Sequence, residues 1–244
     1  MLSALKSMKY DAVGIGRNEL ILGVEKLKPL FEKNGIPMVN SNLIIKSTGQ
    51  PLGEPYVVLK AGSLSVAVFS VLPQGIAEYD PQLVEDLIVI DPAVAVSDLL
   101  SKLKDKVDVT ILLADLNMES SQKLVSNLPG IDIVISNEIS KKALTPGAEN
   151  SKRATILPGC HKGTSLGKLQ LLLEPNEKAT VSENEMIELD DEVLDDPDMN
   201  AIISAAYADR AEERKRKREL LQIEEFKKYR DMSPMEYLEK INEQ

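Results

Sequence analysis

The chain has 244 residues, 43% of them hydrophobic, and a formal net charge of −10 from 39 acidic and 29 basic residues. The acidic excess argues against a general nucleic-acid-binding protein, and the sequence lacks the run of about 18 apolar residues that a membrane span requires. The single cysteine, Cys160, excludes an internal disulfide, and the single histidine, His161, leaves no histidine-rich zinc or di-iron site. A haem attachment motif would need a cysteine where Leu157 stands, so no haem is expected on this chain.

The first 55 residues predict alternating helices and short strands. Apolar residues at helical spacing indicate the end of a helix over 2–9, and a short apolar strand with glycines at its exit follows at 11–16. An amphipathic helix is predicted over 20–34, because Asn34-Gly35 is a good helix stop. A second strand is predicted at 36–39, and 43–55 is rich in glycine and proline and is expected to be an irregular loop.

The middle of the chain predicts a hairpin and then buried strands alternating with helices. Strands at 56–60 and 65–71 flank a short glycine-containing turn. Asp91-Pro92 opens a helix expected over 92–104, because proline is favoured in the first turn of a helix. The nearly all-apolar stretch 107–113 predicts a strand covered on both faces, and a helix at 118–128 and a strand at 131–135 follow.

The last hundred residues change in character. Strands are predicted at 154–157 and 166–173, whereas 174–198 is acidic, poor in large apolar residues and is predicted to be a linker. A charged helix is expected from 200 to about 230, with a last short helix at 234–242. The predicted domain organisation is therefore an α/β domain over 1–173, the linker 174–198 and a helical tail over 199–244.

Three turns that follow predicted strands read Gly-Arg-Asn-Glu at 16–19, Ala-Asp-Leu-Asn at 114–117 and Ser-Asn-Glu-Ile-Ser at 136–140. They resemble the turns Gly-Asn-His-Glu, Ser-His-Leu-Gly and Gly-Gly-His-Ser-His of the 5′-nucleotidase-type metallophosphoesterases, of the calcineurin-like phosphoesterase superfamily. Other segments resemble the family in the same order, including KYDAVGIGRNEL, IPMVNSNLI, SVAVFSVLP, PGIDIVIS and LPGCHKGTSLGKLQLLLE. The resemblance covers roughly residues 4–173 and implies an N-terminally truncated, layered α/β/β/α sandwich.

The resemblance also implies which positions would belong to an active site. Active members hold two divalent cations at the strand ends, and these would activate water against a phosphate ester. The family's metal-binding and catalytic positions fall here on Arg17 (an Asn in the family), Asn18 (the catalytic His), Glu19 (retained), Asp115 (a His), and Glu138 and Ser140 (the last motif). Most of the family's cation ligands are therefore replaced, and the active site is expected to be degenerate.

The residues that remain leave two readings open. Glu19, Asp115 and Glu138 are oxygen ligands that would suit Mn²⁺, Mg²⁺ or Ca²⁺ as a vestigial metal site, but polar residues at strand exits are common simply as caps and turn formers. Arg17 could offer its guanidinium to the phosphate or carboxylate of a ligand, or it could form an ordinary salt bridge.

Three further motifs favour structural explanations. Cys160-His161 resembles a nucleophile pair, but adjacent side chains in an extended stretch point to opposite sides, which favours a turn. Gly14-x-Gly16 lacks the rest of a dinucleotide-binding fingerprint and predicts a turn. The basic run 214–218 is offset by neighbouring glutamates and predicts a solvated helix face.

In the family, the first metal-ligand strands would precede residue 1. Without them, the strand at 11–15 would have an unpaired edge, so we expect either a longer protein or a partner chain that pairs with this strand. The chain as given shows no signal peptide, which predicts a cytoplasmic protein if it is complete. If an N-terminal segment is missing, the resemblance implies a periplasmic or exported protein.

Three functional hypotheses follow. The first is a degenerate phosphoesterase-like domain with a non-catalytic binding or scaffold role. The second is a metal-dependent nucleotide or phosphate-ester hydrolase, completed by a missing N-terminal segment or by a partner chain. The third is a cytoplasmic interaction module that acts through its C-terminal helix.

Overall fold

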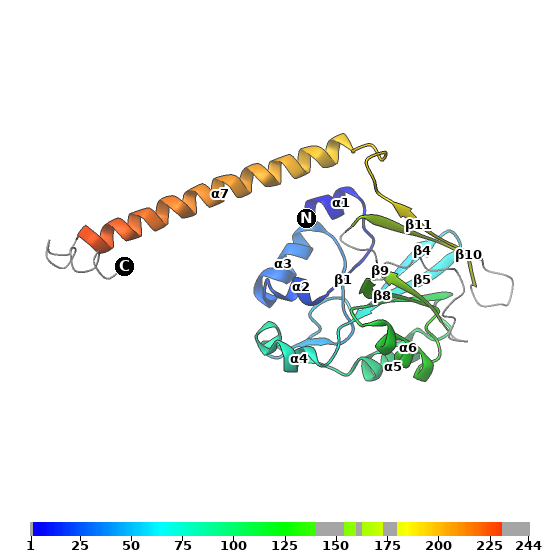
Figure 1. Ribbon diagram of the computed structural model, residues 1–244. Coiled ribbons are helices and arrows are strands. Elements are labelled where there is room, and N and C mark those ends of the chain that lie inside the picture. The colour runs from blue at the N-terminus through cyan, green and yellow to red at the C-terminus, as the bar shows by residue number, and fades with distance from the viewer. Residues whose placement is uncertain (1, 140–153, 160–162, 173–179, 231–244) are drawn as a thin grey trace. The chain divides into compact units, whose positions relative to one another are not determined.

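The computed structural model describes residues 2–139, 154–159, 163–172 and 180–230 (Figure 1). The chain divides into two compact units, one from Met1 to Leu194 and the other from Asp195 to Gln244. No helix among the described residues is long and apolar enough to cross a lipid bilayer.

A five-stranded sheet is the centre of the first unit, with the strand order β4-β5-β7-β8-β9. The strands are β4 (Val57–Ala61), β5 (Leu64–Val71), β7 (Val109–Ala114), β8 (Ile133–Ile139) and β9 (Thr155–Gly159). β4 and β5 form the predicted antiparallel hairpin, whereas β5, β7, β8 and β9 are parallel. The carboxyl ends of the parallel strands therefore meet at one edge of the sheet, where ligand sites of α/β proteins are common.

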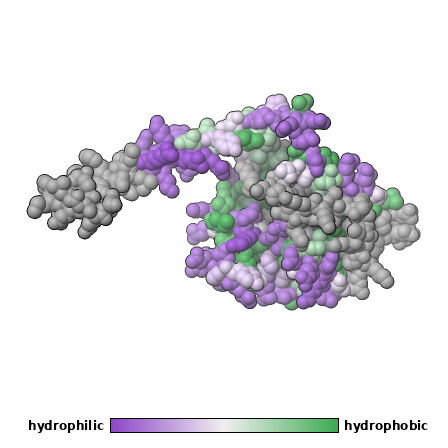
Figure 2. Space-filling model, viewed as in Figure 1, coloured by the Kyte–Doolittle hydropathy of each residue, from purple (hydrophilic) through white to green (hydrophobic). Residues whose placement is uncertain are grey.

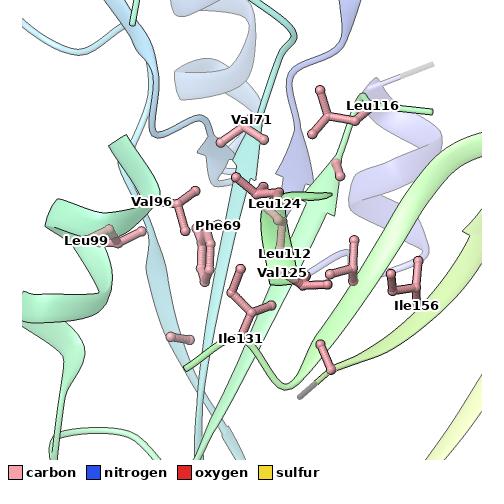
Figure 3. Close-up of a cluster of buried hydrophobic side chains, with 14 of the residues drawn as sticks. Phe69, Val71, Val96, Leu99, Leu112, Leu116, Leu124, Val125, Ile131 and Ile156 are labelled. Carbon is pink, nitrogen blue, oxygen red and sulfur yellow. The ribbon is translucent and has the colours of Figure 1, made fainter. Parts of the chain in front are cut away.

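One face of this sheet is covered by two helices, α5 (Pro92–Leu103) and α6 (Met118–Asn127). Each begins at a capped turn, because the side chain of Asp91 accepts hydrogen bonds from Ala93 and Val94 and that of Asn117 accepts one from Ser120. Figure 3 shows the resulting core, in which apolar residues of both helices pack against Phe69 and Leu112 of the sheet. Predicted helices and strands are confirmed throughout this region.

The opposite face of the sheet is covered by short strands. They are β1 (Val13–Gly14), which pairs in parallel with β2 (Met38–Val39), and β10 (Ser165–Leu172), which pairs antiparallel with β11 (Thr180–Glu188). Ala12 beside β1 and Leu169 and Leu171 of β10 join one apolar cluster with this face of the sheet. The strands thus form a second β layer.

The outermost layer contains α1 (Leu2–Ser7) and α3 (Val24–Asn34). Leu27 and Phe31 of α3 are buried against Ile15 and Met38 of the second β layer. A small antiparallel pair, β3 (Leu43–Ile45) with β6 (Leu87–Val89), completes this part of the core. The order of the layers is helix, sheet, strands, helix, which confirms the predicted α/β/β/α sandwich.

Three short helices flank the carboxyl edge of the sheet: α2 (Arg17–Leu20), α4 (Ile76–Tyr79) and the 3-10 helix η1 (Pro81–Val84). Asn42, which is fully buried, holds the chain where it leaves β5 and β6. Its side chain donates to the carbonyl oxygens of Leu72 and Ile90 and accepts from the N–H of Leu72. The end of β5 and the segment leading into α4 are thereby fixed.

Several predicted boundaries are corrected. The helix expected over 20–34 begins only at Val24, because Gly23 has a φ of 74° and separates α3 from Leu20, the last residue of α2. The stretch 43–55, expected to be irregular throughout, contains β3, which is specified by its distant partner β6. The stretch 174–198, predicted to be a linker, contains β11, which is extended because it pairs along the whole length of β10. The strand expected at 11–16 is the two-residue β1.

The second unit is dominated by α7 (Pro197–Arg230), a single helix of 34 residues. Its described surface is mostly hydrophilic (Figure 2), in agreement with the predicted charged helix. The last predicted helix, 234–242, lies outside the described residues.

Candidate functional site

A cavity of about 610 Å³ lies at the carboxyl edge of the five-stranded sheet. Its walls come from the β1–α2 turn, from α4 and the residues that follow it, and from the ends of β7, β8 and β9. The polar side chains that line it are Arg17, Asn18, Glu19, Ser70, Tyr79, Asp80, Asp115, Ser136 and Asn137. The structure thus gathers, in one cavity, four of the residues proposed from the sequence: Arg17, Asn18, Glu19 and Asp115.

Asp115 joins three segments of this cavity. It directly follows β7, and its backbone N–H donates to the carbonyl oxygen of Val71 at the end of β5. One carboxylate oxygen accepts the backbone N–H of Arg17 at 3.0 Å, and the other accepts the side-chain amide of Asn137. Each oxygen therefore accepts one hydrogen bond within the protein.

Glu19 closes the β1–α2 turn on itself. Its carboxylate accepts the backbone N–H of Gly16 at 2.9 Å, which satisfies a donor at the start of the short helix α2. A Cβ atom at Gly16 would lie 3.0 Å from this carboxylate and 3.4 Å from that of Asp115. A side chain at position 16 would therefore push the carboxylate of Glu19 away by a few tenths of an ångström, so glycine favours the hydrogen bond that closes the turn.

Arg17 pairs with Asp80 rather than with the acidic residues beside it in the turn. The Nη2 atom of Arg17 lies 2.7 Å from a carboxylate oxygen of Asp80, and the two side chains are 62% and 31% exposed. An ion pair this exposed contributes about 0–1 kcal/mol to stability. The salt-bridge alternative for Arg17 is thus what the structure contains.

Among the residues proposed from the sequence, Glu138 and Ser140 are not placed in the cavity by the described part of the chain. Asn18 lines the cavity and is exposed. Glu138 belongs to β8, but its side chain, like Ser140, Cys160 and His161, lies outside the described residues. Neither interpretation of Cys160-His161, as a nucleophile pair or as a turn, is therefore tested by the described residues.

The described residues do not fit a two-cation centre. No group of three or more histidine, cysteine, aspartate or glutamate side chains among them is arranged to hold a metal ion. Both oxygens of Asp115 and one oxygen of Glu19 accept hydrogen bonds from protein groups, and the guanidinium of Arg17 adds positive charge to the same cavity.

Two residues of the site, Asp80 and Asn137, were missed by sequence reasoning. Asp80 lies in no recognisable motif, and only the fold brings it to Arg17. A usable signal existed for Asn137, because alternate residues of a strand share a face. Asn137 is an even number of positions from Ile133 and Ile135 in β8, which predicts that the three share a face. Both Ile135 and Asn137 line the cavity.

Comparisons with known proteins agree with this architecture, although no family model matches the chain. Protein UshA of Yersinia enterocolitica is 24% identical over 165 residues, which are 62% of this chain and 30% of that protein. The 5′-nucleotidase of Vibrio cholerae is 25% identical over 115 residues, which are 47% of this chain and 21% of that protein. The matched region thus spans less than a third of these relatives.

Solved structures match over more of the chain. The calcineurin-like phosphoesterase YfkN from Bacillus subtilis has a TM-score of 0.70 at 21% identity, covering 85% of this chain and 72% of that one. The 5′-nucleotidase precursor from Thermus thermophilus has a TM-score of 0.70 at 17% identity, covering 86% and 45%. Together with the four layers and the site at the strand ends, these likenesses identify the fold of the chain as that of the 5′-nucleotidase-type metallophosphoesterases.

Proposed function

We propose that this chain is a degenerate phosphoesterase-like domain that binds a ligand or partner without hydrolysing it. The state of Asp115 carries the proposal. Its carboxylate stands where the family has a metal-binding histidine, and it ties the β1–α2 turn to β8 through Arg17 and Asn137. Asp115 keeps a lone pair on each oxygen, but among the described residues no group of three or more histidine, cysteine, aspartate or glutamate side chains surrounds it to hold a cation.

Arg17 is the residue we propose as the main ligand contact. It stands where the family has a metal-binding asparagine, so a fixed positive group replaces a group that would bind a cation. Its guanidinium is a planar donor suited to phosphate or carboxylate. A cavity with such a donor can retain an anionic group without activating water against it.

Phosphate release tests the absence of catalysis. With Mn²⁺, Mg²⁺ or Ca²⁺ present, we expect the chain to release phosphate from AMP and from p-nitrophenyl phosphate no faster than buffer does. The 5′-nucleotidase of Vibrio cholerae serves as the positive control. Metal-dependent release that is lost in Asp115→Asn would contradict the proposal, because Asp115 would then be a working ligand.

A second candidate, a hydrolase completed by another segment, is supported by the free edge of β1. Among the described strands, β1 pairs only with β2. Ile135, on the sheet face that the second β layer covers, is 37% exposed, whereas the equivalent residues of the helix-covered face are buried. We propose that a missing N-terminal segment or a partner chain pairs with β1 there.

This second candidate predicts a gain of activity. A longer form of the protein, or a mixture with the partner, should release phosphate in the presence of Mn²⁺ or Mg²⁺, and Ile135→Lys should reduce the gain by obstructing the added strand. Ile21→Lys, at an exposed isoleucine outside the sheet, is the matched control. If the longer form also lacks metal-dependent turnover, this candidate is discarded.

Export from the cytoplasm, which the resemblance implies, remains a prediction.

A further inference from the structure

The ion pair between Arg17 and Asp80 lies in the wall of the cavity and joins segments 63 residues apart. We propose that the cavity binds a small zwitterion, whose oxyanion contacts Arg17 and whose ammonium group contacts Asp80. This inference rests on the proposed binding role of the same site and deepens it by naming the class of ligand. The ligand separates the two side chains and pairs with each of them.

Arg17 has donors to spare and a fixed backbone. A guanidinium carries five N–H donors, and the described contacts of Arg17 use only its Nη2 atom, on Asp80. Its own backbone N–H is held by the carboxylate of Asp115, so the base of the side chain cannot drift from the cavity. The remaining donors are available to a bound oxyanion.

Asp80 is likewise anchored through its backbone and free at one carboxylate oxygen. It follows α4, its N–H donates to the carbonyl oxygen of Ile76, and its own carbonyl accepts the N–H of Leu83. Only one carboxylate oxygen has a described partner, Arg17. The other can accept a hydrogen bond from an ammonium group.

The charge of the cavity excludes a simple anion as the preferred ligand. Its described lining carries three carboxylates, of Glu19, Asp80 and Asp115, against the one guanidinium of Arg17. An anion that displaced Asp80 from Arg17 would leave an unpaired carboxylate beside it, and like charges at close range repel. A ligand with a cationic group offsets that repulsion, so charge complementarity selects a zwitterion.

Tyr79 supplies a second contact for the cationic end. It precedes Asp80 in the chain, lines the cavity and is 85% exposed. An aromatic face attracts an ammonium group, by about 0.5–1 kcal/mol at an exposed site. Tyr79 and Asp80 therefore define the ammonium end of the site, and Arg17 defines the oxyanion end.

Calorimetric titration of the full chain with three probes tests this inference: O-phosphoethanolamine, inorganic phosphate and ethanolamine. We expect O-phosphoethanolamine to bind at least tenfold more tightly than either half-molecule. Arg17→Gln should weaken its binding at least tenfold. Asp80→Asn should remove the preference for the zwitterion and strengthen the binding of phosphate, because the competing carboxylate is gone.

The matched control is the other described ion pair of this unit, Lys168 with Glu185 on β10 and β11, at 3.2 Å. Lys168→Gln removes a cation that is 48% exposed and does not line the cavity, and it should leave all three affinities unchanged. Circular dichroism of each variant confirms that it is folded, as expected for exposed side chains.

Three results would overturn the inference: no binding of O-phosphoethanolamine, equal binding by the wild type and Arg17→Gln, or equal affinity for the zwitterion and for phosphate. The last result leaves the proposed function standing, since Arg17 would still hold an anion. The absence of hydrolysis in the proposed function is tested separately, by the phosphate-release assay, so the two failures are distinguishable.

Discussion

Replacing Phe69 with alanine should lower the free energy of unfolding of the α/β unit by about 3–5 kcal/mol, as expected for a large aromatic side chain removed from a core. Phe69 is fully buried in the middle of β5, in the layer between the sheet and the helices (Figure 3). It packs in one cluster with Val96 of α5 and Leu112 of β7. The surroundings of a truncated core side chain relax only partially, so part of the cavity persists.

Urea unfolding followed by circular dichroism measures this loss, because the midpoint falls in proportion to the change in stability. Val58→Ala on the neighbouring strand β4 is the control, since Val58 is 47% exposed, and it should cost less than about 1 kcal/mol. If Phe69→Ala cost no more than Val58→Ala, the core in Figure 3 would not be the one that stabilises the unit.

Replacing Asp115 with alanine should lower the free energy of unfolding by about 1.5–3 kcal/mol, the range for hydrogen bonds to a charged group. The change leaves two donors without their acceptor, the backbone N–H of Arg17 and the side-chain amide of Asn137. It also releases the β1–α2 turn from β8. Asp115→Ala should therefore weaken ligand binding at Arg17 as well, because the backbone of Arg17 would no longer be held beside the cavity.

Asp98→Ala is the control for Asp115→Ala, because Asp98 is an exposed aspartate on α5, away from the cavity. It should change the free energy of unfolding by no more than about 0.5 kcal/mol. The same urea titration compares the two variants. A loss at Asp115 no larger than that at Asp98 would show that its hydrogen bonds hold nothing in place.

Local sequence signals were enough for the elements that build the sheet and its helical cover. The apolar run of β7 and the turn between β4 and β5 were predictable because strand patterning and turn chemistry act over a few residues. The start of α5 was equally readable, since Asp91 and Pro92 favour a helix start wherever they stand. Even the position of Asp115 at a strand exit could be read in this way.

Elements specified by distant partners could not be read from local patterns. β3 forms because it pairs with β6, more than forty residues away, and β11 forms because β10 lies beside it. The acidic composition of 174–198 concealed this pairing, since exposed strands need few large apolar residues. Gly23, which divides the predicted helix 20–34, is a glycine whose positive φ only the packed turn reveals.

The sequence by itself determined an α/β class of fold, because strand and helix patterns act over a few residues. Its resemblance to the 5′-nucleotidase-type family implied the order of the layers and predicted the positions at which the family's ligands would be replaced. Only the tertiary structure decided what the replacements do. Asp115 takes its hydrogen bonds from Arg17 and Asn137, and Arg17 takes Asp80 as its partner. These contacts join residues 98, 22 and 63 positions apart, and such distances are set by the closure of the whole fold and not by any local preference of the chain.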